Sequence, residues 1–177
     1  MQIEKSGIFG IGFFMKNKSF NKYIPSPVGW LLIETSETAL LKISFVDTCI
    51  EDSPEEPDII TRTESQLTEY FQGKRKEFDL KIDPAGTPFQ KEVWKWVVQV
   101  GFGETASYQD IAMQLGSNKK TRAVGMANGK NPIPIVVPCH RIIGTNGKLT
   151  GYAGGLERKK WLLQHEVRFS DRSGLLF

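Results

Sequence analysis

Apolar residues in the first half of the chain come in short runs rich in β-branched and aromatic side chains. Runs of this length and composition predict strands at residues 8–15, 29–34 and 39–46. Residues 21–27 and 51–57 contain Pro and Ser among polar residues and interrupt these runs. The N-terminal part should therefore begin as a small β-sheet.

The spacing of apolar residues then changes to a helical period. Residues 61–71 place Leu67 and Tyr70 on one face, with Thr63 as a candidate N-cap and Gly73 after the last helical residue. Strands followed by a helix indicate a small α+β unit.

A segment dense in turn formers, residues 83–88, separates this unit from the rest of the chain. A helix should start directly after it, with Thr87 as N-cap and Pro88 at the first helical position. We therefore expect two domains, residues 1–84 and 85–177.

Two short helices joined by a glycine-containing turn are predicted next. Ser107 followed by Asp110 starts the first helix, which ends at Gly116, and residues 119–127 form the second. This layout is typical of a helix-turn-helix, although any pair of antiparallel helices gives the same pattern. Basic side chains near the start of the second helix, Arg122 among them, favour the DNA-binding interpretation.

The remaining elements complete an α+β fold. Asn146-Gly147 predicts a tight hairpin that joins residues 141–143 to residues 148–150, and residues 156–165 have the pattern of a last helix. The expected architecture is a small N-terminal sheet-plus-helix domain followed by a mainly helical C-terminal domain, similar to a winged helix-turn-helix.

Charge is distributed unevenly along the 177 residues, which carry a net charge of only +3. Residues 1–84 hold 10 Lys and Arg against 14 Asp and Glu, whereas residues 85–177 hold 13 against 6. Residues 111–156 contain six basic residues and no acidic one. A basic surface of this kind suits a polyanion such as DNA, but it would also simply keep a protein soluble.

No apolar run is long enough to span a bilayer, so a membrane protein is not expected. Cys49 and Cys139 stand 90 positions apart in no paired motif, which argues against a disulfide scaffold and for a reducing compartment. We expect a cytoplasmic protein, associated with the nucleoid by function, or a nuclear one if the source is eukaryotic.

Cys139 stands at the end of a proline-rich apolar segment, residues 131–138. Three prolines restrict the backbone there and remove hydrogen-bond donors, so the segment should be an extended strap rather than a helix or a central strand. His140 and Arg141 follow at once, and positive charge beside a thiol lowers its pKa. We expect a modestly lowered pKa, because thiolate nucleophilicity falls as the pKa falls.

Less reactive interpretations of Cys139 stand beside this one. Most cysteines are small buried hydrophobes, and we interpret Cys49 in that way. A zinc site would need both cysteines to converge with His140 and His165 without any paired ligand spacing, so no metal is expected. A reactive Cys139 needs a base and an orienting acid, and Glu166 is the candidate to hold His140.

The motifs around Cys139 resemble those of the O6-alkylguanine-DNA alkyltransferases, also called methylated-DNA:protein-cysteine methyltransferases. The resemblance covers residues 87–166. It rests on Asn131-Pro132, Pro138-Cys139-His140-Arg141, Gly151-Tyr152-Ala153-Gly154-Gly155, Phe102-Gly103-Glu104, Ser107-Tyr108, Thr121-Arg122-Ala123-Val124-Gly125 and Trp161-Leu162-Leu163-Gln164-His165-Glu166.

The resemblance implies a single-turnover methyltransferase that acts on duplex DNA. Cys139 would take the alkyl group from O6 of guanine and keep it as a thioether, with no cofactor. Glu166, His140 and a water would draw away the thiol proton, and Asn131 would brace the strap. O4-alkylthymine is a second candidate lesion, and the protein is expected to act as a monomer.

The resemblance also implies residues for binding the damaged base and the DNA. Tyr108 would donate a hydrogen bond to the guanine, Tyr152 would line the pocket, and the backbone at Ala153 would donate to O6. Arg122 would fill the gap that the flipped nucleotide leaves. The other implied DNA-binding residues are Lys119, Lys120 and Thr121.

Two further implications complete the expected site. Arg141 would form a structural ion pair with Glu104. Ala153 stands where some relatives have serine, so only its backbone is left to donate. Two other classes of protein stay open at this point: a helix-turn-helix protein that recognises DNA without chemistry, and a cysteine hydrolase.

Overall fold

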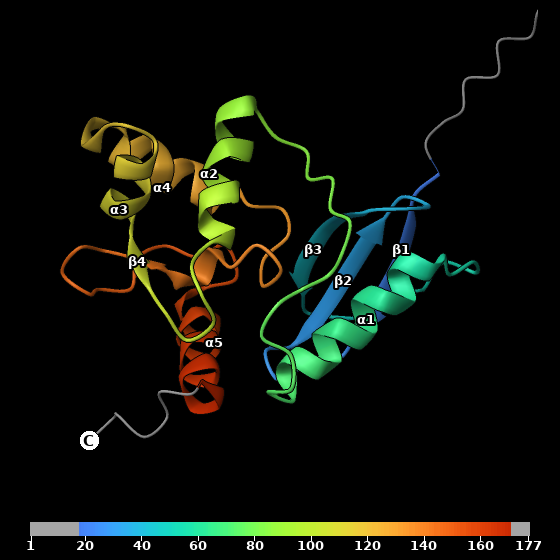
Figure 1. Ribbon diagram of the computed structural model, residues 1–177. Coiled ribbons are helices and arrows are strands. Elements are labelled where there is room, and N and C mark those ends of the chain that lie inside the picture. The colour runs from blue at the N-terminus through green and yellow to red at the C-terminus, as the bar shows by residue number, and fades with distance from the viewer. Residues whose placement is uncertain (1–17, 171–177) are drawn as a thin grey trace, which may run out of the picture.

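The computed structural model describes residues 18–170, so the strand predicted at residues 8–15 lies outside the described part of the chain. Figure 1 shows an N-terminal unit in which one helix lies against a small sheet, and a helical unit on the other side of a long connecting segment. The predicted α+β class, with the sheet first and the helices after it, is confirmed.

The N-terminal sheet has three antiparallel strands in the order β1-β2-β3. They are β1 (Phe20–Ile24), β2 (Trp30–Thr35) and β3 (Leu40–Val46), so the strands predicted at residues 29–34 and 39–46 are confirmed. β1 falls in a segment that we expected to be a turn. Only its first and last residues are buried, and it pairs with β2 alone, so it is an edge strand with too few apolar positions to be recognised.

α1 (Asp58–Phe71) buries Ile60, Leu67 and Tyr70 completely. It begins three residues earlier than predicted, after Pro57, and Thr63 is not its N-cap. The Thr63 hydroxyl instead donates to the carbonyl of Ile59 from inside the helix, so this buried polar group has a hydrogen-bond partner.

The helical unit begins at α2 (Pro88–Val98), which has the predicted cap. The Thr87 hydroxyl accepts from the backbone of Gln90, whose side chain accepts from the backbone of Thr87. α3 (Tyr108–Gln114) has the same arrangement between Ser107 and Asp110. The predicted start signals of both helices are therefore confirmed.

The second helix of the predicted pair is divided in two. A 3-10 turn, η1 (Asn118–Lys120), precedes α4 (Thr121–Gly129), so Lys119 and Lys120 lie in the turn and Arg122 lies in the first turn of α4. α2, α3 and α4 are grouped together in Figure 1, and the indole of Trp94 on α2 donates to the carbonyl of Ala127 on α4.

The predicted hairpin at residues 144–147 is wrong. Gly144 donates to the carbonyl of Lys148 across a turn, but residues 148–150 form no strand. β5 (Ile142–Ile143) pairs instead in parallel with β4 (Ala106–Ser107). The physical reason is a buried lysine, Lys159. Its ammonium group donates hydrogen bonds to the carbonyls of Ile142 and Thr150, which a hairpin would need for bonds between its strands.

The last helix, α5 (Leu156–Phe169), is four residues longer than predicted. Its end packs on the end of α1. Gly73, just after α1, has a φ of 72°, and a Cβ there would lie 2.3 Å from the ring of Phe169. The two units therefore meet closely where α1 and α5 end.

Replacing Gly73 with alanine should lower the free energy of unfolding by more than the same change at Gly116. Gly116 also has a positive φ, 87°, but a Cβ there meets nothing within 4 Å. Both variants carry a left-handed alanine, which costs about 1–2 kcal/mol. Gly73→Ala should lose roughly 1–3 kcal/mol more from overpacking. Urea unfolding measures both, and equal losses would contradict the close packing of α1 on α5.

Candidate active site

Cys139 lies in the protein interior, at the start of η2 (Cys139–Arg141), where the strap ends. Residues 131–138 form neither helix nor strand, as predicted, but the segment is not extended throughout: it turns at residues 135–136, where Pro134 and Val137 form a bridge. Ile135 has a φ of 75° in this turn, a strained value for a β-branched residue. The Asn131 amide donates to the carbonyl of Val137 at 2.8 Å, and its oxygen accepts from the backbone of Ile133 at 3.0 Å. These bonds place Asn131 where it can hold the strap in shape.

Cys139 is only 4% exposed, and burial raises the pKa of its thiol to about 11. A hydrogen bond with Asn131 and the charge of Lys159 lower the pKa but only partly offset burial. The expected modest lowering of the pKa is therefore not found. Arg141, which we expected to supply positive charge, is instead occupied by a buried carboxylate.

That carboxylate is Glu166 on α5, which is fully buried. Its Oε1 accepts from His140 Nε2 at 2.7 Å, from the Tyr70 hydroxyl at 2.8 Å and from Arg141 Nη2 at 3.0 Å. Its Oε2 accepts from Arg141 Nε at 2.9 Å and from the backbone of Gly103 at 3.1 Å. Burial would raise the pKa of Glu166, but the bonds and charges of His140 and Arg141 lower it to about 2.

His140 is completely buried, and burial is the main reason that its pKa lies below 6.5. Because Glu166 is ionised, His140 Nε2 carries the proton of their hydrogen bond, which leaves Nδ1 as an acceptor. Within residues 18–170, Nδ1 has no hydrogen-bond partner, and no direct bond joins it to the Cys139 thiol. Among the described residues, Nδ1 is thus a buried acceptor without a hydrogen-bond partner.

Arg141 has partners that the resemblance did not imply. Its guanidinium binds both oxygens of Glu166 and donates to the carbonyl of Val100, while its expected ion pair with Glu104 stays a prediction. Arg141 therefore joins the network around Glu166 directly.

Lys159 is a site residue that sequence reasoning missed. Its side chain is fully buried, and its ammonium group donates to Ile142 at 2.6 Å and to Thr150 at 3.1 Å. Burial lowers its pKa, against the influence of the Cys139 charge, which raises it. In the sequence Lys159 stands in an Arg-Lys-Lys run that is typical of a solvated helix face, so nothing signals its burial.

The expected base-binding residues differ in their surroundings. The Tyr108 hydroxyl, on a half-buried ring at the start of α3, accepts from the Thr150 hydroxyl at 3.0 Å. The Tyr152 hydroxyl is buried without a hydrogen-bond partner among the described residues, and burial raises its pKa well above 10. Ala153 is exposed in the turn that follows.

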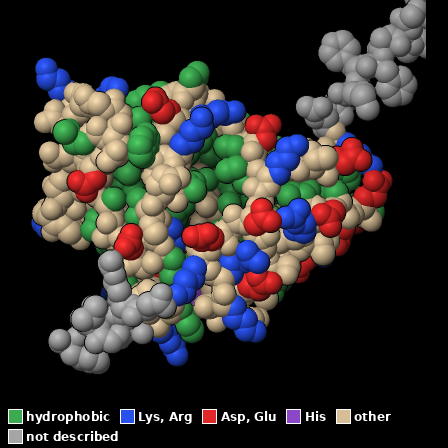
Figure 2. Space-filling model, in the orientation of Figure 1, with side chains coloured by type: hydrophobic (Ala, Val, Ile, Leu, Met, Phe, Trp, Pro, Cys, Tyr) green, Lys and Arg blue, Asp and Glu red, His purple; other side chains and the backbone are tan. Residues whose placement is uncertain are grey.

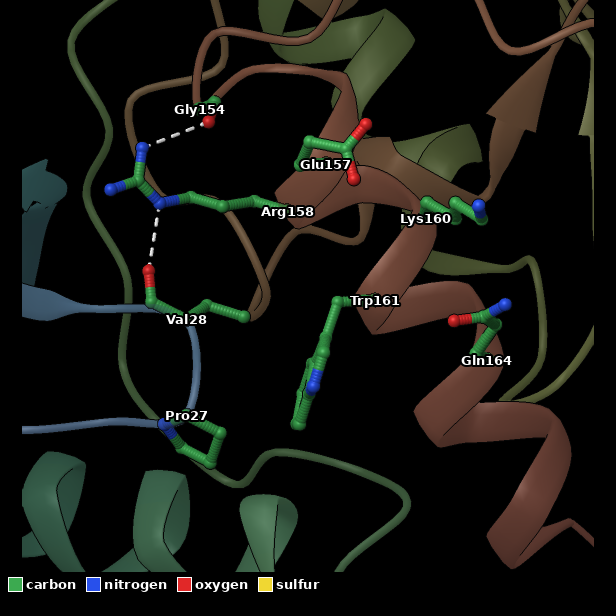
Figure 3. A pocket seen from close by; sticks show the side chains of 8 residues that line it. All are labelled: Pro27, Val28, Gly154, Glu157, Arg158, Lys160, Trp161 and Gln164. Carbon is green, nitrogen blue, oxygen red and sulfur yellow. Dashed lines mark hydrogen bonds between the residues drawn. The ribbon is translucent and has the colours of Figure 1, made fainter.

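The loop that carries Tyr152 and Ala153 contacts the N-terminal unit. Figure 3 shows Arg158 extending from α5, where its Nε donates to Val28 at 2.7 Å and its Nη1 to Gly154 at 3.0 Å. These residues line a pocket of about 530 Å3, whose lining does not include Cys139. The residues that line this pocket therefore do not include the reactive thiol.

The expected DNA-binding residues divide into two groups. Arg122 and Lys119 are exposed at the start of α4 and in η1. Lys120 donates to the carbonyl of Leu115 at 2.6 Å, and Thr121 donates to the carbonyl of Asn118, so both stabilise the turn between the helices. Acidic side chains are concentrated over the N-terminal unit in Figure 2.

Neither a metal cluster nor a membrane-spanning helix occurs within residues 18–170. No group of three or more His, Cys, Asp and Glu is placed there to hold a metal ion, and none of the helices is long and apolar enough to cross a bilayer.

Two family models together match most of the chain. Residues 88–168 match the DNA-binding domain of 6-O-methylguanine DNA methyltransferase, and residues 20–84 match its ribonuclease-like domain. The arrangement of Cys139, His140 and Glu166 is found within the first of these. The chain belongs to the 6-O-methylguanine DNA methyltransferase family.

Relatives in bacteria and archaea agree with this assignment. A methylated-DNA–protein-cysteine methyltransferase of Mycolicibacterium paratuberculosis is 46% identical over 158 residues, which cover 87% of this chain and 96% of that protein. One of Methanosarcina barkeri is 45% identical and covers 81% of this chain and 94% of that protein.

Solved structures from Mycobacterium tuberculosis share the fold. Its O6-methylguanine methyltransferase matches with a TM-score of 0.78 at 41% identity, covering 90% of this chain and 99% of that chain. The same organism's OGT in complex with DNA matches with a TM-score of 0.76 at 42% identity, covering 89% of this chain and 98% of that chain.

Replacing Glu166 with glutamine should lower the free energy of unfolding by about 3–5 kcal/mol at pH 7, because it removes the charge that Arg141 and His140 surround. The folded-state pKa of about 2 lies below 4.5, so this stabilisation is complete above pH 4.5 and is lost as the pH falls through 2.

The deficit of Glu166→Gln should therefore shrink below pH 4.5. Denaturant unfolding at several pH values measures it, with Glu157→Gln, at an exposed position of the same helix, as the control. A deficit that is constant from pH 7 to pH 2 would contradict the ionised network.

Proposed function

We propose that this protein repairs DNA by transferring the alkyl group, typically methyl, from O6-alkylguanine in duplex DNA to Cys139, irreversibly and once per molecule. The observation that carries the proposal is the buried His140–Glu166 hydrogen bond directly after Cys139, which leaves His140 Nδ1 as the acceptor for a proton. Family membership and the DNA complex of a relative support the choice of substrate.

In the proposed reaction the sulfur of Cys139 attacks the alkyl carbon, a C–S bond forms and the C–O6 bond breaks. The thiol proton passes through a water to His140 Nδ1, and Glu166 stabilises the imidazolium that results. The guanine anion that leaves is stabilised by the Tyr108 hydroxyl and is then protonated. The thioether has no route back to a thiol, so each protein molecule reacts once.

The high pKa of Cys139 fits this scheme. A pKa of about 11 keeps the thiol protonated in the resting protein, so proton removal must accompany the attack. A thiolate derived from a weakly acidic thiol is also the stronger nucleophile. Burial thus protects the sulfur before the substrate arrives and makes the thiolate more reactive once it forms.

DNA binding must expose the lesion, because an alkyl group on O6 inside a duplex cannot be reached. We propose that α4 lies on the DNA and that Arg122 fills the space left by the flipped nucleotide. Lys119 is exposed for contact with phosphate, whereas Lys120 and Thr121 act through the turn that they hold. Tyr152 and the backbone at Ala153 would contact the flipped base.

Several expectations stay predictions. We propose a cytoplasmic location, with the DNA, or a nuclear one in a eukaryote, and a monomer. The division into domains at residues 84 and 85 is supported by the two family matches, which end at 84 and begin at 88. O4-alkylthymine stays a second candidate lesion.

Cys139→Ala should abolish uptake of the methyl group from an O6-methylguanine duplex while leaving DNA affinity nearly unchanged, because affinity comes mostly from phosphate contacts. Intact-mass spectrometry of the protein after incubation measures uptake. Cys49→Ala is the control and should gain one methyl group like the natural chain, because Cys49 is exposed on the surface and not buried as the sequence predicted. A natural chain that binds the duplex but stays unmodified would show a binding module instead.

Arg122→Ala should slow repair of duplex DNA by about 10- to 100-fold, because base flipping costs a few kcal/mol that the inserted side chain offsets. Its reaction with free O6-methylguanine, which needs no flipping, should stay nearly unchanged. Lys119→Ala serves as the control and should weaken DNA binding without slowing the reaction of bound DNA. Equal slowing of Arg122→Ala with both substrates would remove Arg122 from base flipping.

A further inference from the structure

The buried carboxylate of Glu166 receives one hydrogen bond from outside the helical unit. The Tyr70 hydroxyl donates at 2.8 Å to Oε1, the same oxygen that accepts from His140 Nε2. Tyr70 is in the last turn of α1, in the N-terminal unit, and is completely buried. The proton relay is therefore completed by a side chain that lies 96 positions before Glu166 in the sequence.

Tyr70 is held in this position by three kinds of contact. Its backbone carbonyl accepts from His165 Nε2 at 2.8 Å, so consecutive residues of α5 both bind Tyr70. Its ring packs against Phe78 and Phe102, with ring centroids 5.6 and 6.0 Å away, and against His165 at 5.3 Å. A ring enclosed in this way cannot turn its hydroxyl away from Glu166.

We propose that Tyr70 is a positioning residue for alkyl transfer, through which the N-terminal domain fixes the Glu166 carboxylate and adjusts the strength of His140 as a base. The proposal rests on the relay put forward in the proposed function. It assigns to α1, a helix of the N-terminal unit, a part in the reaction.

The physical basis is the sharing of one oxygen by several donors. Oε1 of Glu166 divides its negative charge among His140, Tyr70 and Arg141. Without the Tyr70 hydroxyl, more of that charge acts on His140 and stabilises its protonated form. The groups that face His140 are Glu166 and Lys159 of α5 and Arg141 of η2. A Tyr70 variant keeps all three of these residues.

The test is the pH dependence of methyl transfer from free O6-methylguanine, which needs neither DNA binding nor base flipping. Transfer requires neutral His140, so the rate falls at acid pH as His140 becomes protonated. We call this fall of the rate at low pH the acid limb. In Tyr70→Phe the pH at which it occurs should rise by on the order of half a unit, which corresponds to the loss of one net hydrogen bond. It should also slow transfer at neutral pH by roughly tenfold, as the loss of a supporting hydrogen bond does at other sites.

Two further variants separate positioning from stability. Phe71→Leu disturbs the ring next to Tyr70, with centroids 5.3 Å apart, and should lower stability without moving the acid limb. Placing 3-fluorotyrosine at position 70 keeps the shape of the ring and makes the hydroxyl a stronger donor, so the acid limb should move downward. This variant decides the matter even if Tyr70→Phe fails to fold.

An acid limb that stays in place in both Tyr70 variants, with only stability altered, would overturn the proposal and leave alkyl transfer standing. A natural chain that takes up no methyl group from the duplex or the free base would instead refute the proposed function. The two failures are therefore distinguishable.

Discussion

A single ionised carboxylate in the interior organises this protein. Glu166 is removed from water, and a buried charge is tolerable only when donors surround it. Five hydrogen bonds from four residues do so, and they come from α1, from the segment before β4 and from η2. The folding of both units around one charge thus fixes the orientation of the imidazole that follows Cys139.

The strap and the buried lysine, together with the carboxylate, hold the segments around Cys139 in place. Asn131 shapes the proline-rich segment that ends at Cys139, and Lys159 ties β5 to the loop that carries Tyr152. The thiol consequently lies at the end of a segment that is held by hydrogen bonds, and burial raises its pKa to about 11. In the proposed reaction, reactivity therefore depends on the arrangement around the thiol rather than on a thiol that is acidic at rest.

Local signals in the sequence predicted much of this. The caps at Thr87 and Ser107, the helical pair, and the strap before Cys139 depend on neighbouring residues and could be recognised. The edge strand β1, the replacement of the hairpin by a parallel pair and the burial of Lys159 depend on contacts between distant segments. Periodicity placed Tyr70 on the core face of its helix, but no pattern within α1 reveals that its hydroxyl reaches Glu166. The sequence predicted a lowered pKa for Cys139, whereas the pKa is raised in the structure. Burial, which the sequence does not show, outweighs the nearby charge.

The contact of Arg158 with the N-terminal turn links the two units beside the loop that carries Tyr152. Arg158 donates to the carbonyls of both Val28 and Gly154. The ring of Phe45 lies so close to Gly154 that a Cβ added there would be only 2.7 Å from a ring carbon. The loop that carries Tyr152 thus belongs to the helical unit and is supported by the N-terminal unit. Changes near Val28 or Phe45, far along the chain from Cys139, would therefore alter how the loop that carries Tyr152 is held.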